Sequence, residues 1–462
     1  MKFHCVEGKK RMNFKTKLAV ISGRFTQWFL QTFTNGGSSL PGKVATRINP
    51  DLLKELAKNY KVVLITGTNG KSVTTSMTVN ILKQKFNHVM TNDTGSNMLQ
   101  GVVSSFIQDA KNEKVEDKIA VLEVDEASLR RVTEFINPEI ILVNNLFPDQ
   151  MDRNGSPEDV YDLILEGIGK TPNSLIMLNG DAPILNSKSM DNKQEFFGFS
   201  LKDSNYVIEA EGNAIDSICP NCGEKLEYSS LIYSDLGDYY CPNCDFKRPK
   251  LTNTIDEIIE MTTESASFKI NDYIYTIPVA GLYNIYNALA AYSIGHYFGL
   301  EESSIENGLN SMTRMFGRQE VIKVGNKDVR MNLVKNSVGL NEVINLIDLE
   351  QKEFSLIIIL NDNLADGRDI SWIEEGDFDK FKDMPVKETY VSGTRQDDLT
   401  NHLINNGFST EELRPLEDAK AIVEAIKNMQ TDKVYILTTY TSMLDLREEM
   451  YNQGLVKSRM KA

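Results

Sequence analysis

The sequence lacks any long hydrophobic run. No window of its 462 residues holds eighteen uninterrupted apolar residues, so we expect no membrane-spanning helix. The first seventeen residues are basic, but they lack an apolar core and a small-residue cleavage site, so they do not form a secretory signal. We therefore expect a cytoplasmic protein.

An excess of positive charge is also missing. The chain has 50 Lys and Arg against 65 Asp and Glu, which gives a net charge of −15. This balance argues against a nucleic-acid-binding protein, which usually presents a basic face. A charged content of 25% and a hydrophobic content of 41% are typical of a globular protein, and the length predicts two or three domains.

Cysteine is scarce, with five residues, but four of them are paired in two Cys-x₂-Cys motifs. These are Cys219 with Cys222 and Cys241 with Cys244, with eighteen residues between the pairs. This spacing suits tetrahedral Zn²⁺, and four cysteine ligands leave no open position, so the site would be structural. Two disulfides are the alternative, which a cytoplasmic location disfavours.

A glycine-containing loop is the most informative motif. The apolar stretch 62–66 leads into Gly67-Thr68-Asn69-Gly70-Lys71-Ser72, and a helix-like segment follows. Strand, loop and helix in this order are typical of a phosphate-binding loop, in which backbone N–H groups and the helix dipole face the phosphates. Lys71 would reach the terminal phosphates and Ser72 would ligate Mg²⁺. The first glycine of the strict pattern falls on Ile65, so a chance glycine turn is the alternative.

Five further motifs carry a family resemblance. They are Thr91–Asn97, Val121–Glu126, Asn144–Arg153, Gly281–Ala291 and Gly317–Glu320. In this order they resemble motifs of the Mur ligase family, the ATP-dependent ligases of peptidoglycan precursors, which includes folylpolyglutamate synthetases. Two positions depart from the family pattern, because Gln150 and Tyr283 stand where the family carries histidine.

The resemblance implies roles for single residues. It assigns Lys71 to catalysis, and Mg²⁺ to Ser72, Glu123 and Gln150, the last directly or through water. The implied nucleotide contacts are Gly67, Thr68, Asn69, Gly70, Lys71, Ser72, Asn97, Asn284 and Arg318. Two of these residues have plainer alternatives: Glu123 as an ordinary strand-end acid and Asn284 as a helix cap.

The predicted fold class is α/β. The resemblance implies a central Mur ligase ATP-binding domain over residues 59–316, with a zinc ribbon inserted at about residues 205–250. A Rossmann-like C-terminal domain would follow over residues 317–462. Residues 1–58 would form a short N-terminal segment in place of the uridine-nucleotide-binding domain of typical family members. The expected strands are residues 62–66, 119–124, 140–144, 174–178, 356–360, 388–392 and 434–437, with a helix at 417–429.

Residues 15–33 predict an amphipathic, basic helix. Such a helix can lie on a membrane surface, which would make the protein peripheral at the cytoplasmic membrane. Its short apolar stripe favours the alternative, in which the helix packs on the next domain.

The segment 360–373 resembles one branch of the family through its Ala-Asp-Gly-Arg-Asp-Ile-Ser-Trp run. That branch amidates the α-carboxylate of D-glutamate in the stem peptide of lipid II. Its ammonia comes from a class I glutamine amidotransferase subunit of the GatD type, with which the ligase forms a heterodimer. Peptide-adding family members carry a lysine near Asp366, and an acid at this position suits an enzyme that takes ammonia.

The same resemblance suggests that this chain supplies the acid that orients the histidine of the amidotransferase. Asp366 is the first candidate and Asp369 the second, with a helix cap before Ile370 as the alternative role of Asp369. Two other functions stay open at this point: a folylpolyglutamate-type ligase and a non-catalytic ATP-binding scaffold for the amidotransferase.

Overall fold

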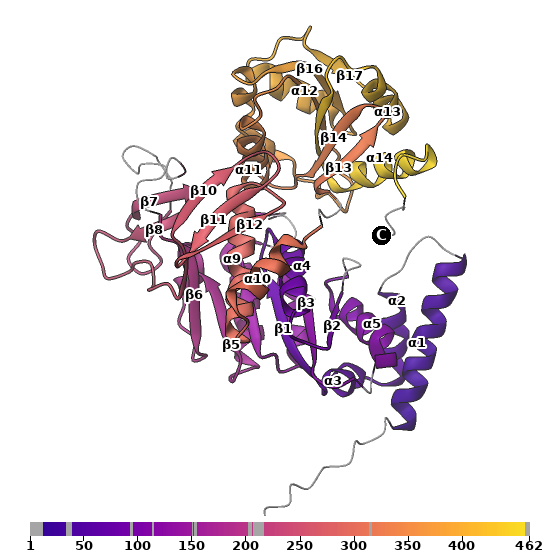
Figure 1. Ribbon diagram of the computed structural model, residues 1–462, viewed down its shortest axis with the longest axis vertical. Helices are drawn as coiled ribbons and strands as arrows, with labels where there is room; N and C mark the ends of the chain where they lie inside the picture. Colours follow the sequence, from indigo (N-terminus) through magenta and orange to yellow (C-terminus); the bar gives the residue numbers. More distant parts are fainter. Residues whose placement is uncertain are drawn as a thin grey trace, which may run out of the picture.

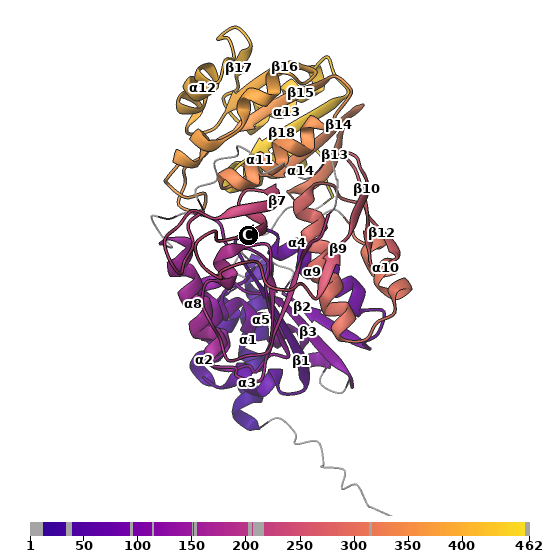
Figure 2. The same ribbon diagram turned by 90° about the vertical axis from the view of Figure 1, so that its left-hand side faces the viewer.

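The computed structural model describes residues 13–33, 39–92, 96–112, 115–149, 151, 155–201, 206, 217–313 and 317–457. Its helices and strands form two units, each built on a mainly parallel sheet with its own apolar core. We call them the central unit and the C-terminal unit. Figures 1 and 2 show the C-terminal unit stacked on one end of the central unit, next to helices α4 and α9.

Seven parallel strands form the sheet of the central unit. Their order is β2 (His88–Thr91), β3 (Lys118–Glu123), β1 (Tyr60–Thr66), β4 (Ile140–Val143), β5 (Leu175–Asn179), β6 (Gln194–Phe199) and β9 (Asn253–Ile255). The four strands expected here from the sequence are confirmed to within two residues. Their nearly continuous apolar runs reflect burial on both faces, which parallel sheets require.

Helices cover both faces of this sheet. Helices α4 (Lys71–Leu82), α9 (Leu282–Tyr297) and α10 (Glu302–Asn310) pack together on one face. Helices α5 (Leu99–Asp109), α6 (Glu126–Val132) and α8 (Pro157–Gly169) form a row on the other. This arrangement follows from right-handed crossovers between parallel strands.

Two antiparallel elements are added to the central unit. The hairpin of β7 (Glu227–Tyr233) and β8 (Leu236–Tyr240) lies between the two cysteine pairs in the sequence. A separate sheet is formed by β10 (Glu257–Met261), β11 (Ala266–Ile270) and β12 (Tyr273–Ile277).

Among the described residues before β1, the chain forms three helices. They are α1 (Phe14–Phe33), α2 (Leu40–Ile48) and α3 (Leu52–Ala57), and all three contact α5. Helix α1 buries its small side, which includes Ala19 and Gly23, and a Cβ on Gly23 would lie 2.8 Å from the side chain of Ile107. The sequence correctly predicts a helix packed on the next unit. Its large apolar side chains, however, lie on the opposite, exposed side.

The C-terminal unit is a six-stranded sheet in the order β13 (Arg318–Val324), β14 (Lys327–Leu333), β18 (Lys433–Thr438), β15 (Phe354–Ile359), β16 (Val386–Ser392) and β17 (Leu413–Pro415). Only the β13–β14 pair is antiparallel. The main helices are α11 (Ser337–Asp348), α12 (Gln396–Asn405), α13 (Ala419–Asn428) and α14 (Tyr440–Asn452). The expected strands and helix of this part are confirmed. In the described part of the chain, no helix combines the length and the hydropathy needed to cross a bilayer.

Candidate active site

The loop between β1 and α4 depends on two glycines. Gly67 has a φ of 127° and Gly70 a φ of 83°, both in the region that side chains disfavour. A Cβ on Gly67 would lie 2.8 Å from the carbonyl oxygen of Asn145, and one on Gly70 would lie 2.1 Å from Oδ1 of Asn287. The loop is therefore a cradle that only glycine permits, which fits the predicted phosphate site.

Two asparagines after β4 hold this loop in place. The N–H of Thr68 donates to the carbonyl oxygen of Asn145 (3.0 Å), and the N–H of Asn69 donates to Asn145 Oδ1 (2.8 Å). Asn144 Nδ2 donates to the Thr74 hydroxyl at the start of α4 (2.9 Å). The sequence placed both asparagines in a family motif, but it gave them no role.

Lys71 begins α4 and points back over the loop. Its ammonium donates to the carbonyl oxygen of Gly67 (2.5 Å) and forms an ion pair with Glu126 Oε1 (2.8 Å). Burial lowers the pKa of Lys71, but Glu126, Glu123 and Asp125 raise it by more, so the lysine stays charged. Glu126 was not predicted as a site residue, and its place beside Lys71 comes from the tertiary structure.

Three predicted residues meet at the carboxyl end of β3. The Ser72 hydroxyl donates to Glu123 Oε2 (2.7 Å), and Asn97 Nδ2 lies 3.4 Å from Glu123 Oε1. Asn92 fixes the backbone of Glu123 through bonds of 2.8 and 2.9 Å. A hydroxyl and a carboxylate oxygen are the donors that Mg²⁺ prefers, so this donor set fits a magnesium ion. Gln150 lies outside the described residues.

A cleft opens beside the loop, and residues of both units line it. Four of the predicted nucleotide contacts line it, namely Asn69, Gly70, Asn284 and Arg318. Asn284 Nδ2 donates to the carbonyl oxygen of Ala280 (2.7 Å) at the start of α9. Asn284 is therefore not the cap of α9, because the N-cap is Gly281 and no side chain there accepts from the free N–H groups.

Arg318 crosses from the C-terminal unit toward the phosphate loop. Burial lowers the pKa of its guanidinium, and the nearby groups Glu123 and Tyr283 oppose that shift. Asn69 and Asn336 also join the units, because each side-chain amide donates to the other's oxygen (3.3 and 3.2 Å). Lys335 forms an ion pair with Asp149 between the same units.

Two cleft residues carried no signal in the sequence. Tyr233, at the end of β7, brings the hairpin between the cysteine pairs to the wall of the cleft. Glu342, on α11, is 5% exposed, and burial raises its pKa to about 7. Neither residue lies in a recognisable motif, because its place in the cleft depends on how distant elements pack.

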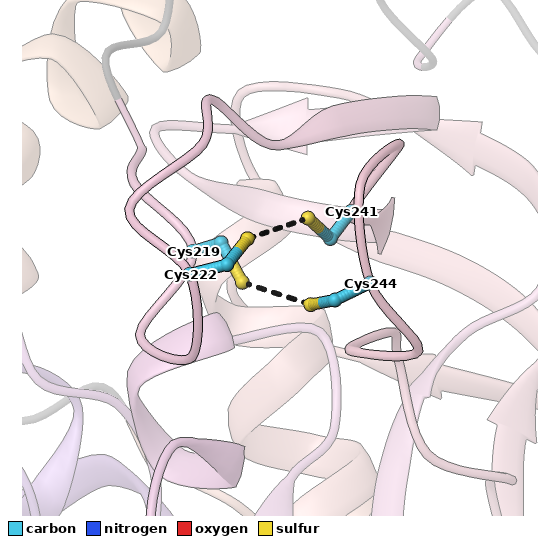
Figure 3. Close-up of side chains that lie close together, drawn as sticks. All are labelled: Cys219, Cys222, Cys241 and Cys244. Carbon is cyan, nitrogen blue, oxygen red and sulfur yellow. Dashed lines mark hydrogen bonds between the residues drawn. The ribbon is translucent and has the colours of Figure 1, made fainter.

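The four paired cysteines come together as predicted. Their Sγ atoms lie within 4.8 Å of one another, and Cys219–Cys244 and Cys222–Cys241 are each 3.5 Å apart. Figure 3 shows the two knuckles facing each other across the site. Tetrahedral zinc with bonds of about 2.3 Å places sulfurs about 3.8 Å apart, so the geometry fits zinc. It does not fit two disulfides, whose sulfurs are about 2.05 Å apart.

The two candidate acids of the C-terminal unit differ in exposure. Asp366 is 6% exposed and accepts hydrogen bonds from the backbone N–H (2.7 Å) and hydroxyl (2.6 Å) of Thr441, at the start of α14. Asp369 is exposed, and its Oδ1 accepts from the Ser371 N–H (2.9 Å) at the start of the short helix Ser371–Glu375. Both acids therefore have a local structural role, and Asp369 alone of the two lies at the surface.

Comparison with known proteins identifies the family. Residues 65–220 match the model of the Mur ligase middle domain, and residues 333–443 match the model of the MurT ligase C-terminal domain. Over 97% of its length the chain is 39% identical to the MurT subunit of lipid II isoglutaminyl synthase (glutamine-hydrolyzing) from Streptococcus pneumoniae R6, and the match covers all of that subunit. The chain belongs to the MurT family. The MurT subunit from Staphylococcus aureus COL is 35% identical, covering 79% of this chain and 82% of that one.

A solved structure shows the shared fold. The pseudomurein peptide ligase type C from Methanothermus fervidus superposes with a TM-score of 0.64 at 19% identity, covering 87% of this chain and 81% of that one. The MurT-family chain thus has the α/β fold of the Mur ligases, as the sequence predicted, with a four-cysteine cluster in its central unit.

Proposed function

We propose that this chain is the ATP-dependent ligase subunit of a lipid II isoglutaminyl synthase, and that it converts the α-carboxylate of D-glutamate in the lipid II stem peptide to an amide. One observation carries the proposal: Lys71, Ser72 and Glu123 meet at the glycine loop of a chain that aligns along its whole length with a MurT subunit. A folylpolyglutamate-type ligase is disfavoured by the same alignment.

The first step activates the carboxylate. Its oxygen attacks the γ-phosphorus of ATP, which gives an acyl phosphate and ADP. The start of α4 receives the phosphates, because its N-cap, Gly70, offers no side-chain bond to the free N–H groups of the first turn. Lys71 leaves Glu126 to neutralise charge on the transferring group, and catalysis is mostly positioning. Bound Mg²⁺, held by Ser72 and Glu123, would neutralise further phosphate charge.

The second step forms the amide. Ammonia attacks the acyl carbon, phosphate leaves, and the nitrogen loses a proton. Ammonium, the main form at neutral pH, is not a nucleophile, so the site needs a local source of ammonia. Among the described histidines, His88 pairs with Asp109 (2.8 Å), His296 stacks on Tyr292, and His402 packs on Phe378. None of these three contacts is a Cys–His pair for glutamine hydrolysis.

A second subunit would therefore supply the ammonia. We assign this role to a GatD-type class I glutamine amidotransferase in a heterodimer with this chain, and the complex would act in the cytoplasm on a lipid-linked acceptor. The relatives named above are themselves called subunits, which supports this assignment. An acid from this chain would orient the partner's histidine. The exposure of Asp369 now makes it the first candidate, ahead of the buried Asp366.

We further propose that Cys219, Cys222, Cys241 and Cys244 hold a structural Zn²⁺, and that nucleotide contacts come from Asn97, Asn284 and Arg318 as well as from the glycine loop. Support comes from the four converging sulfurs and from the lining of the cleft. The chain would then consist of a short N-terminal segment to residue 58, a P-loop ATPase domain over 59–316 and a Rossmann-like domain from 317.

An assay with this chain alone tests the proposed activity. ADP release and amide formation are measured with lipid II, ATP, Mg²⁺ and a high concentration of ammonium chloride. An enzyme gives both products in equal amounts without any partner. Neither product would form if the chain were only a scaffold for the amidotransferase, and ADP without amide would leave the acceptor assignment wrong.

The nitrogen source separates the roles of the two acids. In the complex with the amidotransferase, Asp369→Asn should abolish glutamine-driven amidation and leave ammonium-driven amidation intact. Asp366→Asn serves as a structural comparison, since it should lower the melting temperature by weakening the contacts to Thr441. Equal loss of amidation with glutamine and with ammonium would show that Asp369 acts in the ligase site instead.

A further inference from the structure

Helix α1 carries a stripe of large apolar side chains that point away from the protein. We call it the α1 stripe. Its members are Phe14 (83% exposed), Leu18 (45%), Ile21 (64%), Phe25 (62%), Trp28 (55%), Phe29 (46%) and Phe33 (64%). At 100° per residue they fall within a sector of about 140°, so they form one continuous face. Most soluble surfaces expose such residues singly, and a contiguous stripe indicates an interaction surface.

The α1 stripe is not needed to hold the helix in place. The opposite face of α1 is buried through Thr16, Ala19, Val20 and Gly23 and packs on α2, α3 and α5. Figure 1 shows α1 at the outer edge of the central unit, outside α2 and α5 and away from the C-terminal unit. Because the small side chains already anchor the helix, the exposed stripe is available to something outside the chain.

Charge indicates what that partner is. Residues 1–50 contain nine Lys and Arg and one Asp or Glu, a net charge of +8, whereas residues 51–462 contain 41 and 64, a net charge of −23. Lys15 and Lys17 lie at the two edges of the α1 stripe by helical geometry, and both are exposed. On α2, which packs beside α1, Lys43 and Arg47 are exposed as well.

We propose that the α1 stripe docks the protein on the surface of an anionic lipid bilayer. Phenylalanine, tryptophan and leucine on one face, with lysine at its borders, are typical of a helix that lies in the membrane interface. The basic residues would add attraction to anionic headgroups and would keep this edge, of an otherwise acidic protein, toward the membrane. This inference rests on the proposed function in one respect: a lipid-linked acceptor stays in the bilayer, so a docked enzyme meets it by diffusion in two dimensions.

Tryptophan fluorescence tests the proposal directly. The chain has two tryptophans, Trp28 in the α1 stripe and Trp372, so Trp372→Phe leaves Trp28 as the single reporter. Vesicles of phosphatidylcholine with phosphatidylglycerol, free of lipid II and nucleotide, should shift its emission to shorter wavelength. Pure phosphatidylcholine vesicles should give a smaller shift, and high salt should reduce the effect. No shift with the anionic vesicles would overturn the proposal.

Co-sedimentation with the same vesicles tests the stripe in the otherwise unchanged protein. Phe25→Ser/Trp28→Ser/Phe29→Ser should lower the bound fraction at least about tenfold, because apolar burial drives interfacial binding. Ile259→Ser/Ile274→Ser is the matched control, since these side chains are similarly exposed (45% and 53%) but lie on β10 and β12. Melting temperatures of all variants verify folding, and the stripe variant should melt within a few degrees of the parent protein.

Three outcomes would overturn the proposal. The first is unchanged vesicle binding by the stripe variant, and the second is equal loss in the control variant. The third is a dimer, found by sedimentation, that the stripe substitutions convert to a monomer, because the stripe would then bind a second copy. The vesicles contain no lipid II, so the fluorescence and co-sedimentation results do not depend on whether the proposed amidation activity is correct. Amidation of detergent-solubilised lipid II should be unchanged in the stripe variant, whereas vesicle-embedded lipid II should be amidated more slowly.

Discussion

At the scale of single residues, the environment of a side chain decides its chemical role. Lys71 is held as a cation by Glu126 and by the carbonyl oxygen of Gly67, with its ammonium over the loop that would receive the phosphates. Asp366, which the sequence favoured as the acid for a partner's histidine, is buried and accepts hydrogen bonds from Thr441, and its role toward a partner stays a prediction. Substitutions of Lys71 and of Glu342 allow quantitative predictions at this scale.

Removing the Lys71 ammonium should abolish most catalysis. We expect Lys71→Ala to lower the rate of ammonium-driven amidation about 1,000-fold, because the lysine stabilises charge on the transferring phosphoryl group. Lys83→Ala is the matched control, since Lys83 is exposed at the other end of α4 and should leave the rate unchanged. Steady-state phosphate release measures the rate of both variants. Near-normal turnover of Lys71→Ala would show that the glycine loop is not the catalytic phosphate site.

Glu342 should make stability depend on pH. Its pKa is about 7 in the folded protein, chiefly through burial, against about 4.5 unfolded. The folded state then binds the proton more tightly, so stability falls as pH rises from about 4.5 to about 7 and stays low above that. Glu342→Gln should remove this loss. At pH 8 it should be more stable than the parent by up to about 3 kcal/mol, at about 1.4 kcal/mol per pKa unit.

Urea unfolding at pH 5 and pH 8 measures the effect of Glu342→Gln. At pH 5 the two proteins should agree within about 1 kcal/mol, since Glu342 is protonated in the folded state there. An equal difference at both pH values would point to packing rather than to ionisation. A parent protein more stable than the variant at pH 8 would show that Glu342 carries a stabilising charge.

At the scale of elements, the β7–β8 hairpin contacts the cleft as well as the four-cysteine cluster. Arg248 pairs with Asp181 (2.9 Å) and Asp238 (3.0 Å), and the Tyr286 hydroxyl of α9 donates to Asp181 (2.7 Å). The ring of Tyr233 then packs edge-on against Tyr286, with ring centroids 5.8 Å apart. The hairpin therefore forms part of the wall against which a nucleotide would bind.

Loss of zinc should therefore weaken ATP binding. We expect Cys219→Ser/Cys222→Ser to lose about one Zn²⁺ per chain, lower the melting temperature and weaken ATP binding about tenfold, or about 1.4 kcal/mol. Metal analysis, calorimetry and ATP titration measure these effects. Tyr233→Leu is the comparison, because it should weaken ATP binding while zinc content is unchanged. Unaltered ATP affinity in both variants would show that the β7–β8 hairpin does not contribute to ATP binding.

At the scale of the whole molecule, the site depends on contact between two units. Asn336 is the N-cap of α11, where it accepts from the Gly339 N–H (2.8 Å), and it also pairs with Asn69 of the glycine loop. Asn336 thus links the start of α11, in the C-terminal unit, directly to the glycine loop of the central unit. Arg318 reaches the cleft from the same unit.

Removing the Asn69–Asn336 hydrogen bonds should weaken the contact between the two units at the cleft. Asn336→Ala should cost about 1 kcal/mol through the lost cap and should also weaken ATP binding. Asp418→Ala is the matched control, because Asp418 caps α13 through the Ala421 N–H (2.7 Å) and lies far from the cleft in sequence and outside its lining. Both variants should lose similar stability, and only Asn336→Ala should raise the dissociation constant for ATP. Equal ATP affinities would show that the Asn69–Asn336 pair does not control closure.

The sequence by itself determined the main parallel strands of both units and the local motifs. Strands such as 62–66 and 356–360 were predicted because parallel strands, buried on both faces, are written as continuous apolar runs. The glycine loop and the cysteine pairs were predicted because their chemistry depends on fixed spacing along the chain. Residues 67–72 and the two cysteine pairs therefore needed no tertiary information.

Only the tertiary structure decided which distant residues meet. Glu126 beside Lys71, Tyr233 in the cleft, Asn336 against Asn69, and the burial of Asp366 all depend on how helices and sheets pack. The exposed face of α1 belongs to the same class, because its amphipathic pattern is compatible with burial and with docking alike. A pattern of residues specifies which side of an element is apolar, whereas only packing specifies what that side faces.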